Sequence, residues 1–320
     1  MSMGLERRPL TASDARDWAA LLNAIEAADG SDEFTSEQDQ AEALSNPNRD
    51  YPRGSIAIYD GPAMIGYGAL AFRTVPEPDQ NVYHAGGVHP DYRARGLGAE
   101  LLDWAERTAV PLNHERFPGR PMALSSGCLN ANAAAVALHE QRGYQPVRWF
   151  HDMVRDLSQP IPEPVTDDQI TITGYQPDMA EHARLIRNES FRDHWGSAET
   201  SPQSWAHFLA TSAFRPGFSF LAYQQDEPLG MLMASEHEAR QERTGRRDLY
   251  IDLVGTRAAA RKRGIATALL ATAMSAARAA GFDQASLGVD ADSLTGAVGL
   301  YERSGFTVAR TWTAYRKQLT

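Results

Sequence analysis

Apolar residues recur along this chain with two different spacings, and segments with one spacing alternate with segments with the other. Runs with an apolar residue at every second position, such as 55–59 and 64–72, are typical of strands that bury one face. Apolar residues three or four positions apart, such as Trp18, Leu21, Leu22 and Ile25, are typical of helices that pack on a sheet, and the Ala-rich stretch 267–280 also predicts a helix. The alternation predicts a layered α/β (α+β) chain.

The same order of predicted elements occurs twice, as β-αα-βββ-α-β-α-β. Strands of the first half are expected at 5–10, 55–59, 64–72, 81–88, 121–128 and 145–157. Those of the second half are expected at 169–175, 218–223, 229–235, 249–254, 284–289 and 307–318. Three alternating prolines within 158–168 favour an extended spacer. We therefore expect two domains, 1–157 and 169–320, each with a mostly antiparallel sheet flanked by helices, joined by a linker at 158–168.

A short glycine-containing turn stands at the same place in both halves. Residues 261–266 read Arg-Lys-Arg-Gly-Ile-Ala, between the strand 249–254 and the helix that follows. Small residues let the backbone approach a bulky group, and the N–H groups at a helix start suit a phosphate or pyrophosphate. Residues 93–98, Arg-Ala-Arg-Gly-Leu-Gly, precede a helix at 99–108 that we expect Pro111 to end. Their recurrence 168 positions apart indicates a duplicated domain.

Composition narrows the classes of function. The chain has 320 residues, 42% of them hydrophobic, a formal net charge of −10 and a pI near 5.4. This charge argues against a nucleic-acid-binding protein and favours a cationic amine as substrate. The single cysteine, Cys128, permits no intrachain disulfide, and no apolar run reaches membrane-spanning length. We expect a cytoplasmic protein with no membrane partner and, since no His/Cys cluster has ligand spacing, no metal.

With both turns in view, the chain resembles the GNAT superfamily of acyl-CoA-dependent N-acyltransferases, present twice. A second pair of motifs supports the resemblance, Leu-Tyr-Glu-Arg-Ser-Gly-Phe at 300–306 and Leu-His-Glu-Gln-Arg-Gly-Tyr at 138–144. It covers nearly the whole chain apart from the linker. Within the superfamily, the tandem arrangement is similar to that of the mycothiol synthases.

The resemblance implies that acetyl-CoA binds along the turn and the strand before it. The pyrophosphate would lie on the turn, and the pantetheine arm beside the strand, where a backbone N–H would polarise the thioester carbonyl. The implied cofactor-binding residues are Leu253, Val254, Gly255, Arg261, Lys262, Arg263, Gly264, Ile265, Ala266 and Thr267. Their possible counterparts in the first half are Val88, Arg93, Arg95, Gly96, Leu97 and Gly98.

Acyl transfer to an amine needs a base for the ammonium and an acid for the departing thiolate. Asp252 is the candidate base, because it interrupts an apolar strand where a charge is costly without a task or partner. A structural Asp held by a neighbouring backbone group or Arg is the alternative. Tyr301 is the candidate acid, by its place in the second motif. His84 and His139 stand at these two places in the first half, so that half either catalyses with histidines or keeps the fold without catalysis.

Acceptor recognition is expected from the helices that precede each hairpin. In the second half Glu189, Asp193 and His194 could bind a cationic amine while Trp195 stacks on it, or they could simply end a solvated helix. The leading hypothesis is an acetyl-CoA-dependent N-acetyltransferase for a small-molecule amine, catalysed by 169–320 and acting as a monomer of two packed domains. The alternatives are a protein or peptide N-acetyltransferase and a non-catalytic acyl-CoA-binding regulator, which would need the turns but neither Asp252 nor Tyr301.

Overall fold

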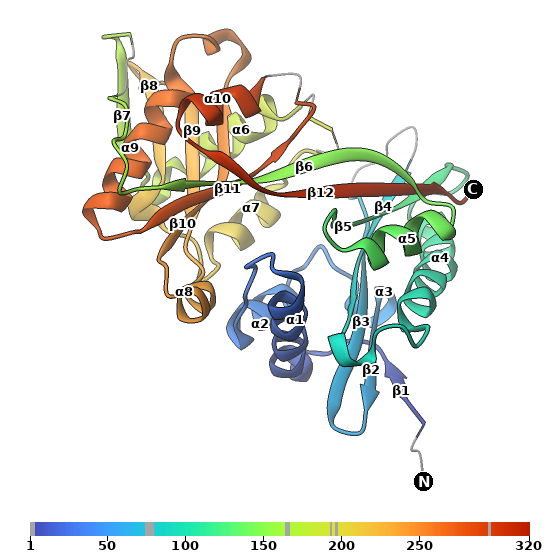
Figure 1. The fold of residues 1–320 in the computed structure, drawn as a ribbon. Helices are drawn as coiled ribbons and strands as arrows, with labels where there is room; N and C mark the ends of the chain where they lie inside the picture. Colours follow the sequence, from blue (N-terminus) through green and yellow to red (C-terminus); the bar gives the residue numbers. More distant parts are fainter. Residues whose placement is uncertain (1–3, 74–79, 164–166, 193, 196–197, 294–295) are drawn as a thin grey trace. The chain divides into compact units, whose positions relative to one another are not determined.

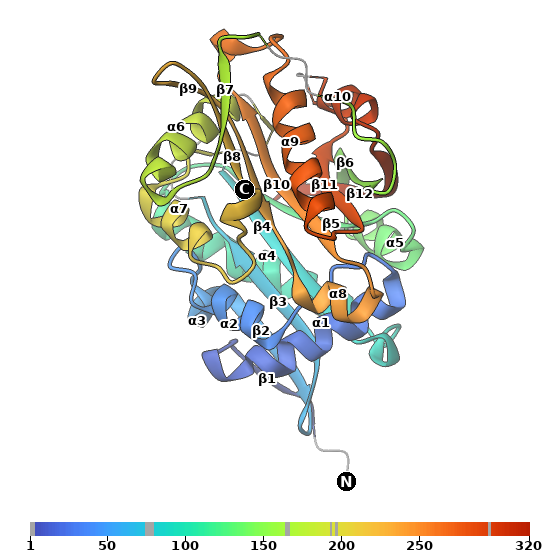
Figure 2. The ribbon, with the colours of Figure 1, turned by 90° about the vertical axis from the view of Figure 1, so that its left-hand side faces the viewer.

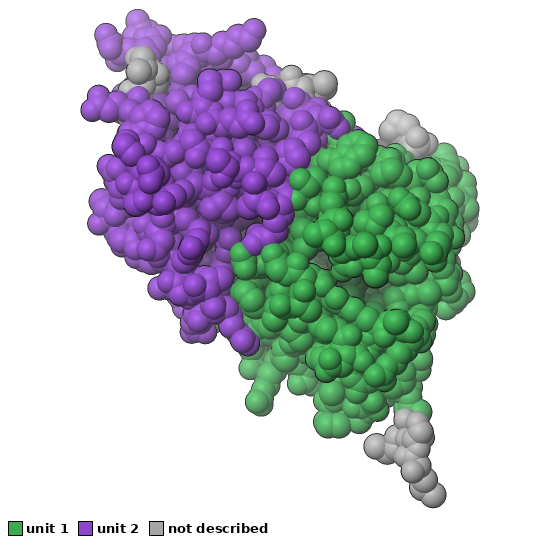
Figure 3. All heavy atoms as spheres, in the orientation of Figure 1, with its two compact units in different colours: residues 1–149, 311–320 green, residues 150–310 purple. Residues whose placement is uncertain are grey.

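The chain divides into two units, each built around its own part of a β-sheet. The computed structural model describes the chain except residues 1–3, 74–79, 164–166, 193, 196–197 and 294–295 (Figure 1). We call Met1–Trp149 with Thr311–Thr320 unit 1, and Phe150–Arg310 unit 2 (Figure 3).

Unit 1 contains a sheet with the strand order β1-β2-β3-β4-β5-β12. The strands β4 and β5 are parallel, and β1–β2, β2–β3, β3–β4 and β5–β12 are antiparallel. Its strands are β1 (Glu6–Arg8), β2 (Ser55–Asp60), β3 (Ala63–Ala71), β4 (Gln80–Val88), β5 (Met122–Leu129) and the end of β12 (Thr307–Gln318). Its helices are α1 (Ala15–Asp29), α2 (Glu37–Leu44), α3 (Tyr51–Gly54), α4 (Leu97–Arg116) and α5 (Ala133–Gln141).

Unit 2 repeats this plan with the strand order β6-β11-β10-β9-β8-β7. Here β10 and β11 are the parallel pair, and the neighbouring pairs are antiparallel. Its strands are the end of β6 (Gln145–Asp156), β7 (Ile170–Gly174), β8 (Phe220–Gln224), β9 (Glu227–Ser235), β10 (Asp248–Thr256) and β11 (Gln284–Asp290). Its helices are α6 (Ala180–Ser190), α7 (Pro202–Leu209), α8 (Glu238–Thr244), α9 (Ile265–Ala279) and α10 (Ala297–Arg303).

Helices cover both faces of the unit 2 sheet. Along β9, Leu232 belongs to the cluster that contains Leu269 of α9, whereas Met231 and Met233 belong to the cluster that contains Ile186 of α6. Because successive strand residues point to opposite faces, α9 and α6 pack on opposite sides. Figure 2 shows α9 lying along the strands. The sheet is thus buried on both faces around β9 and β10, the strands that position the site.

The two units exchange their closing strands. The end of β6 follows α5 of unit 1 but pairs with β11 of unit 2, and the end of β12 follows α10 of unit 2 but pairs with β5 of unit 1. Tyr315 of β12 is 3% exposed in the core of unit 1, and Met153 of β6 is fully buried in unit 2. The units therefore differ at their ends from the boundaries 1–157, 158–168 and 169–320 expected from the sequence. A strand's alternating pattern fits either of two similar edges, so it does not specify which one it joins.

The exchanged β6 brings a buried cation to the end of α10. Arg155 is 5% exposed, and its Nη2 donates a hydrogen bond to the carbonyl of Pro160 at 2.6 Å. Burial lowers the pKa of this guanidinium from its usual value. A Cβ atom added at Gly305, which follows α10 with φ 85°, would collide with Nη1 of Arg155. The glycine of the 300–306 motif therefore leaves room for an arginine.

Three helices differ from the prediction. Helix α3, a single turn at Tyr51–Gly54, was not expected. Helix α4 does not end at Pro111 but continues to Arg116. A proline removes one helical hydrogen bond, and α4 tolerates this because both flanking turns bury apolar residues such as Ala109 and Leu112. Helix α8, between β9 and β10, was not predicted, since its sequence is polar throughout and has no hydrophobic period.

Candidate active site

The site of unit 2 starts where two parallel strands stop pairing. Strands β10 and β11 pair only from Asp248 to Tyr250 and from Gln284 to Ser286, although both continue beyond these residues. Past this point the facing N–H and C=O groups of the two strands do not bond to each other, so they can bind a ligand. In unit 1, β4 and β5 pair from Gln80 to Tyr83 and then separate in the same way.

The turn after β10 has the backbone of an anion-binding site. Lys262 has φ 64° and Gly264 has φ 79°, so left-handed residues alternate with right-handed or extended ones up to the start of α9. Such alternation turns successive N–H groups to one side. No side chain among the described residues caps the N-terminus of α9, so its first N–H groups stay available for an anion. The predicted turn residues Ile265, Ala266 and Thr267 form this first turn.

Residues outside the turn form hydrogen bonds with the side chains of its two arginines. Arg261 donates from Nη2 to the carbonyl of Ser190 at 3.2 Å, and Arg263 donates to Asp167 at 2.8 Å and to Gln224 at 3.0 Å. These contacts orient both guanidinium groups beside the turn.

Two buried hydroxyls near the turn lack partners among the described residues. The oxygen atoms Oγ of Ser190 and Oγ1 of Thr256 are buried without a hydrogen bond. A buried hydroxyl without a partner is costly, so a polar ligand that satisfies it binds favourably. A Cβ atom at Gly255 would lie 3.0 Å from Oγ of Ser190, so this predicted residue keeps the backbone close to the hydroxyl. The left-handed turn, the uncapped helix and the two hydroxyls fit a phosphate-bearing cofactor such as CoA.

Unit 1 has the same turn, but the arginine that is paired with a carboxylate stands at a different position: the first arginine in unit 1 and Arg263 in unit 2. Ala94 has φ 59° and Gly96 has φ 85°. In the part of the chain that the structure describes, no side chain caps the N-terminus of α4, which begins with Leu97 and Gly98. Here, however, Arg93 forms two hydrogen bonds with the carboxylate of Asp29, at 2.6 and 3.0 Å. This pairing reduces the charge that Arg93 can offer to a ligand.

The remaining predicted residues of unit 1 flank its turn. Arg95 donates to the carbonyl of Asp91 at 2.8 Å and lies over the ring of Tyr92. Val88 accepts a 3.3 Å bond at its carbonyl from Arg93.

Asp252 occupies a β-bulge. Ile251 pairs with Ala234 and Leu253 with the next residue, Met233, so Asp252 is the extra residue of β10. Its Oδ2 lies 2.7 Å from Oγ of Ser235, whose hydroxyl donates. Burial raises the pKa of Asp252 to about 7, against the opposing effect of the Ser235 hydrogen bond. A carboxyl with this pKa can accept and release protons near neutral pH.

Tyr301 lies on α10, in the same unit. Its side chain is 9% exposed and packs edge-on against Phe306 at 6.0 Å between ring centroids. Burial raises the pKa of Tyr301 to about 12, so the phenol stays protonated at neutral pH and can donate a proton or a hydrogen bond.

Two histidines replace this pair in unit 1. His84 is 8% and His139 is 5% exposed, and Nε2 of each is buried without a partner among the described residues. Burial, with a smaller contribution from His139, lowers the pKa of His84 to about 4, and burial also lowers that of His139. His139 stacks on Tyr315 of the exchanged strand at 4.8 Å. Both imidazoles are therefore neutral at pH 7.

The predicted acceptor residues are only partly brought to the site. Glu189 bonds to Nε of Arg257 at 2.7 Å and accepts from the N–H of Ala258 at 3.3 Å, so its carboxylate holds the start of the turn. Nδ1 of His194 lies 3.0 Å from the carbonyl of Trp195, whose ring lies 6.0 Å from that of Phe150. Asp193 lies outside the described residues. An acceptor-binding role for these residues stays a prediction.

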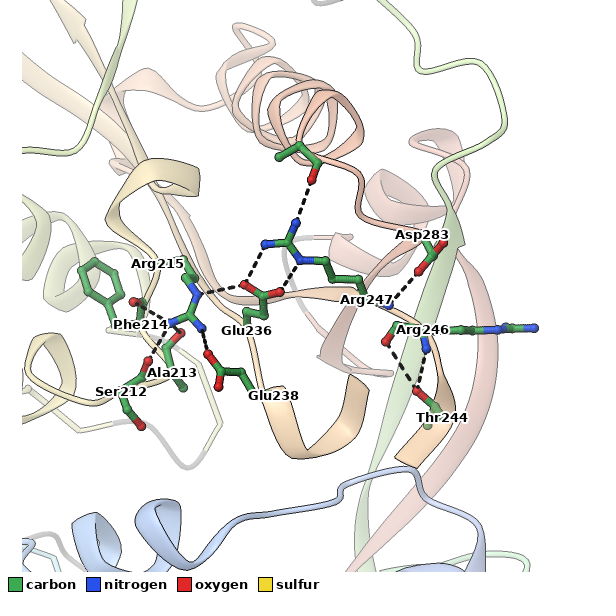
Figure 4. A network of polar contacts seen from close by, with 11 residues as sticks. Ser212, Ala213, Phe214, Arg215, Glu236, Glu238, Thr244, Arg246, Arg247 and Asp283 are labelled. Carbon is green, nitrogen blue, oxygen red and sulfur yellow. Dashed lines mark hydrogen bonds and ion pairs between the residues drawn. The ribbon is translucent and has the colours of Figure 1, made fainter. Parts of the chain in front are cut away.

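Ser235 is a site residue that the sequence analysis missed, as are Ser190 and Thr256. Ser235 ends the apolar strand β9 and gives no chemical signal by itself. The residue after it, Glu236, lies between two guanidinium groups, with Arg215 at 2.9 Å and Arg247 at 2.5 Å (Figure 4). Burial works against ionisation of Glu236, but the two arginines outweigh it and lower its pKa. Ser235 lies next to Asp252 because the pairing of β9 with β10 shifts at the bulge. This shift cannot be predicted from the sequence of either strand alone.

Among the described residues there is neither a metal-binding cluster nor a helix that could span a membrane. No group of three or more His, Cys, Asp or Glu side chains in the described ranges is arranged to hold a metal ion. Within the same part of the chain, every helix is too short or too polar to cross a membrane.

Comparison with known families shows to which family the chain belongs. The family model described as the Acetyltransferase (GNAT) family matches residues 18–144 and, again, residues 181–306. The chain belongs to this family. It is an acetyl-CoA-dependent N-acetyltransferase with two tandem GNAT domains, as the paired motifs predicted.

Full-length relatives share this tandem arrangement. A mycothiol acetyltransferase of Salinispora tropica is 30% identical over 316 residues, covering 96% of this chain and 93% of its own. That of Streptomyces scabiei is 27% identical over 322 residues, covering 98% and 95%. Among solved structures, a GCN5-related N-acetyltransferase from Sphaerobacter thermophilus aligns with a TM-score of 0.76 at 26% identity, covering 98% of this chain and 96% of its own. A tandem GNAT protein from the clavulanic acid biosynthesis pathway aligns with a TM-score of 0.75 at 15% identity, covering 99% of both, and shares the fold.

Proposed function

We propose that unit 2 carries the acetyl transfer, with Asp252 as general base and Tyr301 as general acid, and that the acceptor is a small polar amine. The observation that carries the proposal is the bulged Asp252 with a pKa raised to about 7. A base is most effective when its pKa lies near the working pH, because it is then largely ionised and still binds a proton well.

The turn of unit 2 holds the donor. The N–H groups from Lys262 to Thr267 and the uncapped start of α9 bind the pyrophosphate, and Arg261 adds charge. Arg263 lies beside the turn, but its ion pair with Asp167 reduces the charge it can offer. Thr256 and Ser190 offer hydroxyls to polar atoms nearby. Acetyl-CoA, when bound, supplies the thioester carbonyl that the amine attacks.

Proton transfer is divided between two side chains. Asp252 removes a proton from the acceptor ammonium, directly or through one water, so that the amine is neutral. Tyr301 donates its phenolic proton to the departing sulfur as the C–S bond breaks, and it regains a proton from the nitrogen of the tetrahedral intermediate, which loses its second proton as the amide forms. The pKa of Tyr301, about 12, exceeds that of a free thiol, so the phenol gives up the proton only as negative charge develops on the sulfur.

Unit 1 keeps the turn without the chemistry. His84, with a pKa of about 4, binds a proton too weakly to deprotonate an ammonium efficiently at pH 7. His139 lies stacked and buried in the core. We propose that unit 1 is structural, with a cofactor site that does not transfer.

The acceptor class follows from charge and from the relatives. A net charge of −10 attracts a cationic amine and disfavours nucleic acid. The full-length relatives are mycothiol acetyltransferases by name, so their acceptor is a small molecule. We propose a small polar amine of that kind, and a protein that works as a monomer in the cytoplasm.

Thiol release from acetyl-CoA tests the function. The assay uses a panel of primary amines that includes amino sugars, amino acid amides and polyamines, with mass spectrometry to identify the acetylated product. We expect amine-dependent CoA release whose rate falls below pH 7. Cofactor binding by calorimetry with no transfer to any amine would contradict the proposal.

A further inference from the structure

We propose that Ser235 is a positioning residue for Asp252, whose carboxylate it orients and stabilises in the ionised form that accepts the proton. This inference rests on the proposed function, in which Asp252 is the base. It assigns a task to a serine that no sequence motif marks.

The contact is short and enclosed. Oγ of Ser235 lies 2.7 Å from Oδ2 of Asp252, and Ser235 is 3% exposed. Ser235 pairs through its backbone with Tyr250, so the extra residue of the bulge lets Asp252 reach back to it from the neighbouring strand. A hydrogen bond from a hydroxyl to a charged carboxylate is stronger than one between neutral groups. Ser235 therefore favours the ionised over the protonated carboxyl.

Ser235 is itself firmly held. Its backbone forms a bridge with Phe214, and the N–H of the next residue, Glu236, donates to the carbonyl of Ala213 at 2.9 Å. The carboxylate of Glu236 is fixed between Arg215 and Arg247 (Figure 4). Arg247 in turn donates from its backbone N–H to Asp283 at 2.7 Å, just before β11. The network anchors the end of β9, so the hydroxyl of Ser235 stays in place when Asp252 changes its proton.

Other ionisable groups near β10 have different partners. On β10, Asp248 pairs with Arg240 and Ser286. After β9, Glu236 pairs with Arg215 and Arg247, and His237 packs on Tyr250. On α6 Glu189 pairs with Arg257, and on α10 Tyr301 packs on Phe306. Within the described residues, the influences on the pKa of Asp252 are burial, the Ser235 hydroxyl and the backbone N–H of Asp252 itself. The hydroxyl is thus the side-chain group that opposes burial.

Carboxyl ¹³C NMR of the whole protein tests this without any acceptor. The Asp252 signal is assigned by its loss in Asp252→Asn and followed against pH. We expect Ser235→Ala to raise the pKa of Asp252 by about 1–2 units, the equivalent of one hydrogen bond to a charged group. Ser235→Thr keeps the hydroxyl and should restore the wild-type value, and Ser235→Cys, a weaker donor, should give a smaller rise. If Ser235→Ala fails to fold, the Cys and Thr variants still decide the outcome.

A matched control lies on the next strand. Ser286→Ala removes a hydroxyl that donates to Asp248 at 2.5 Å, so it should leave the titration of Asp252 unchanged. An unshifted Asp252 in folded Ser235→Ala and Ser235→Cys, or an equal shift in Ser286→Ala, would overturn the proposal.

Kinetics then separate this inference from the function beneath it. With the amine that reacts best in the panel, the acid limb of kcat/KM should move to higher pH in Ser235→Ala. At pH 7 the rate should fall about 5- to 50-fold as the ionised fraction falls, and most of the loss should disappear at pH 9.5. Full activity of Asp252→Asn would refute the role of Asp252. An inactive Asp252→Asn with an unmoved Ser235→Ala profile would refute the role of Ser235 alone.

Discussion

Units 1 and 2 hold nearly the same backbone around different side chains. Both have a separating parallel strand pair, a left-handed turn and an uncapped helix. At the two positions that we propose for proton transfer, however, unit 2 has Asp252 and Tyr301 where unit 1 has His84 and His139. The difference teaches that both units keep the backbone of the proposed donor site, whereas the side chains proposed for proton transfer are present in unit 2 alone.

The strands that carry these positions differ as well. Strand β10 is bulged at Asp252, whereas β4 pairs with β3 in an unbroken register through His84. A bulge changes the direction of a side chain and increases local twist. His84 instead points into a space so tight that a Cβ atom at Gly86 would lie 2.8 Å from its ring. His84 also has a hydroxyl neighbour, Oγ of Ser126 at 3.5 Å from its Nδ1, but this contact is longer than the 2.7 Å between Ser235 and Asp252. The geometry of unit 1 thus encloses its imidazole, while that of unit 2 gives Asp252 a closer hydroxyl partner.

The largest effect is expected from Asp252→Asn. It should lower kcat by about 10²–10⁴-fold by removing the base, with unchanged acetyl-CoA affinity measured by calorimetry. His84→Asn, the matched change in unit 1, should leave kcat unchanged. Equal losses in both variants would mean that both units catalyse.

The same variant should gain stability at pH 8. The folded pKa of Asp252, about 7, exceeds the ordinary 3.8, so its contribution to stability is complete below pH 4 and is lost as the pH rises to 7. Asn carries no charge to bury, and we expect a gain of roughly 1–3 kcal/mol in the free energy of unfolding at pH 8. Denaturant unfolding at pH 4 and pH 8 measures it, and an equal difference at both pH values would contradict the assigned pKa.

Gly305→Ala should destabilise the protein by about 2–4 kcal/mol, because the new methyl group meets the guanidinium of Arg155 as well as a left-handed backbone. Its counterpart in unit 1 is Gly143→Ala. Gly143 has φ 80°, but an added Cβ would meet open space, so we expect a loss of about 1 kcal/mol in stability. Thermal unfolding of the two variants tests this order. The double variant Gly305→Ala with Arg155→Ala should recover part of the loss.

Tyr301→Phe should lower kcat about 10- to 100-fold, since the thiolate loses its proton donor, while acetyl-CoA affinity stays the same. His139→Phe in unit 1 should leave kcat unchanged. Stopped-flow thiol release at saturating substrate provides the measurement. A Tyr301→Phe rate equal to that of wild type across the pH range would remove this residue from the mechanism.

The smallest effect concerns the charge at the turns. Arg261 bonds to a carbonyl and Arg93 to the carboxylate of Asp29. Arg261→Ala should raise the KM for acetyl-CoA about two- to fivefold, the size of an exposed charge contact. Arg93→Ala should leave that KM unchanged, and a comparable increase would place catalytic donor binding in unit 1.

Features set by local sequence were predictable. The turns at 93–98 and 261–266, the order of elements and Asp252 as an interrupting charge all follow from patterns a few residues long. The end of α4 was not, because Pro111 is tolerated through packing of the flanking turns.

Features set by pairing between distant segments could not be predicted. The hydrogen bond from Ser235 to Asp252 depends on a register shift between β9 and β10. The task of Glu189 depends on Arg257, a residue 68 positions away. Such contacts join segments whose separate sequences carry no sign of each other.

The exchange of closing strands sets a rule for dissecting the protein. A gene cut within the linker would give two fragments, each ending in the strand whose partners belong to the other. Neither fragment could complete its own sheet, and the unit 2 fragment would also lack Arg155 beside Gly305. When the two fragments are mixed in one solution, each should bind the C-terminal strand of the other. Activity should therefore return with a second-order dependence on concentration.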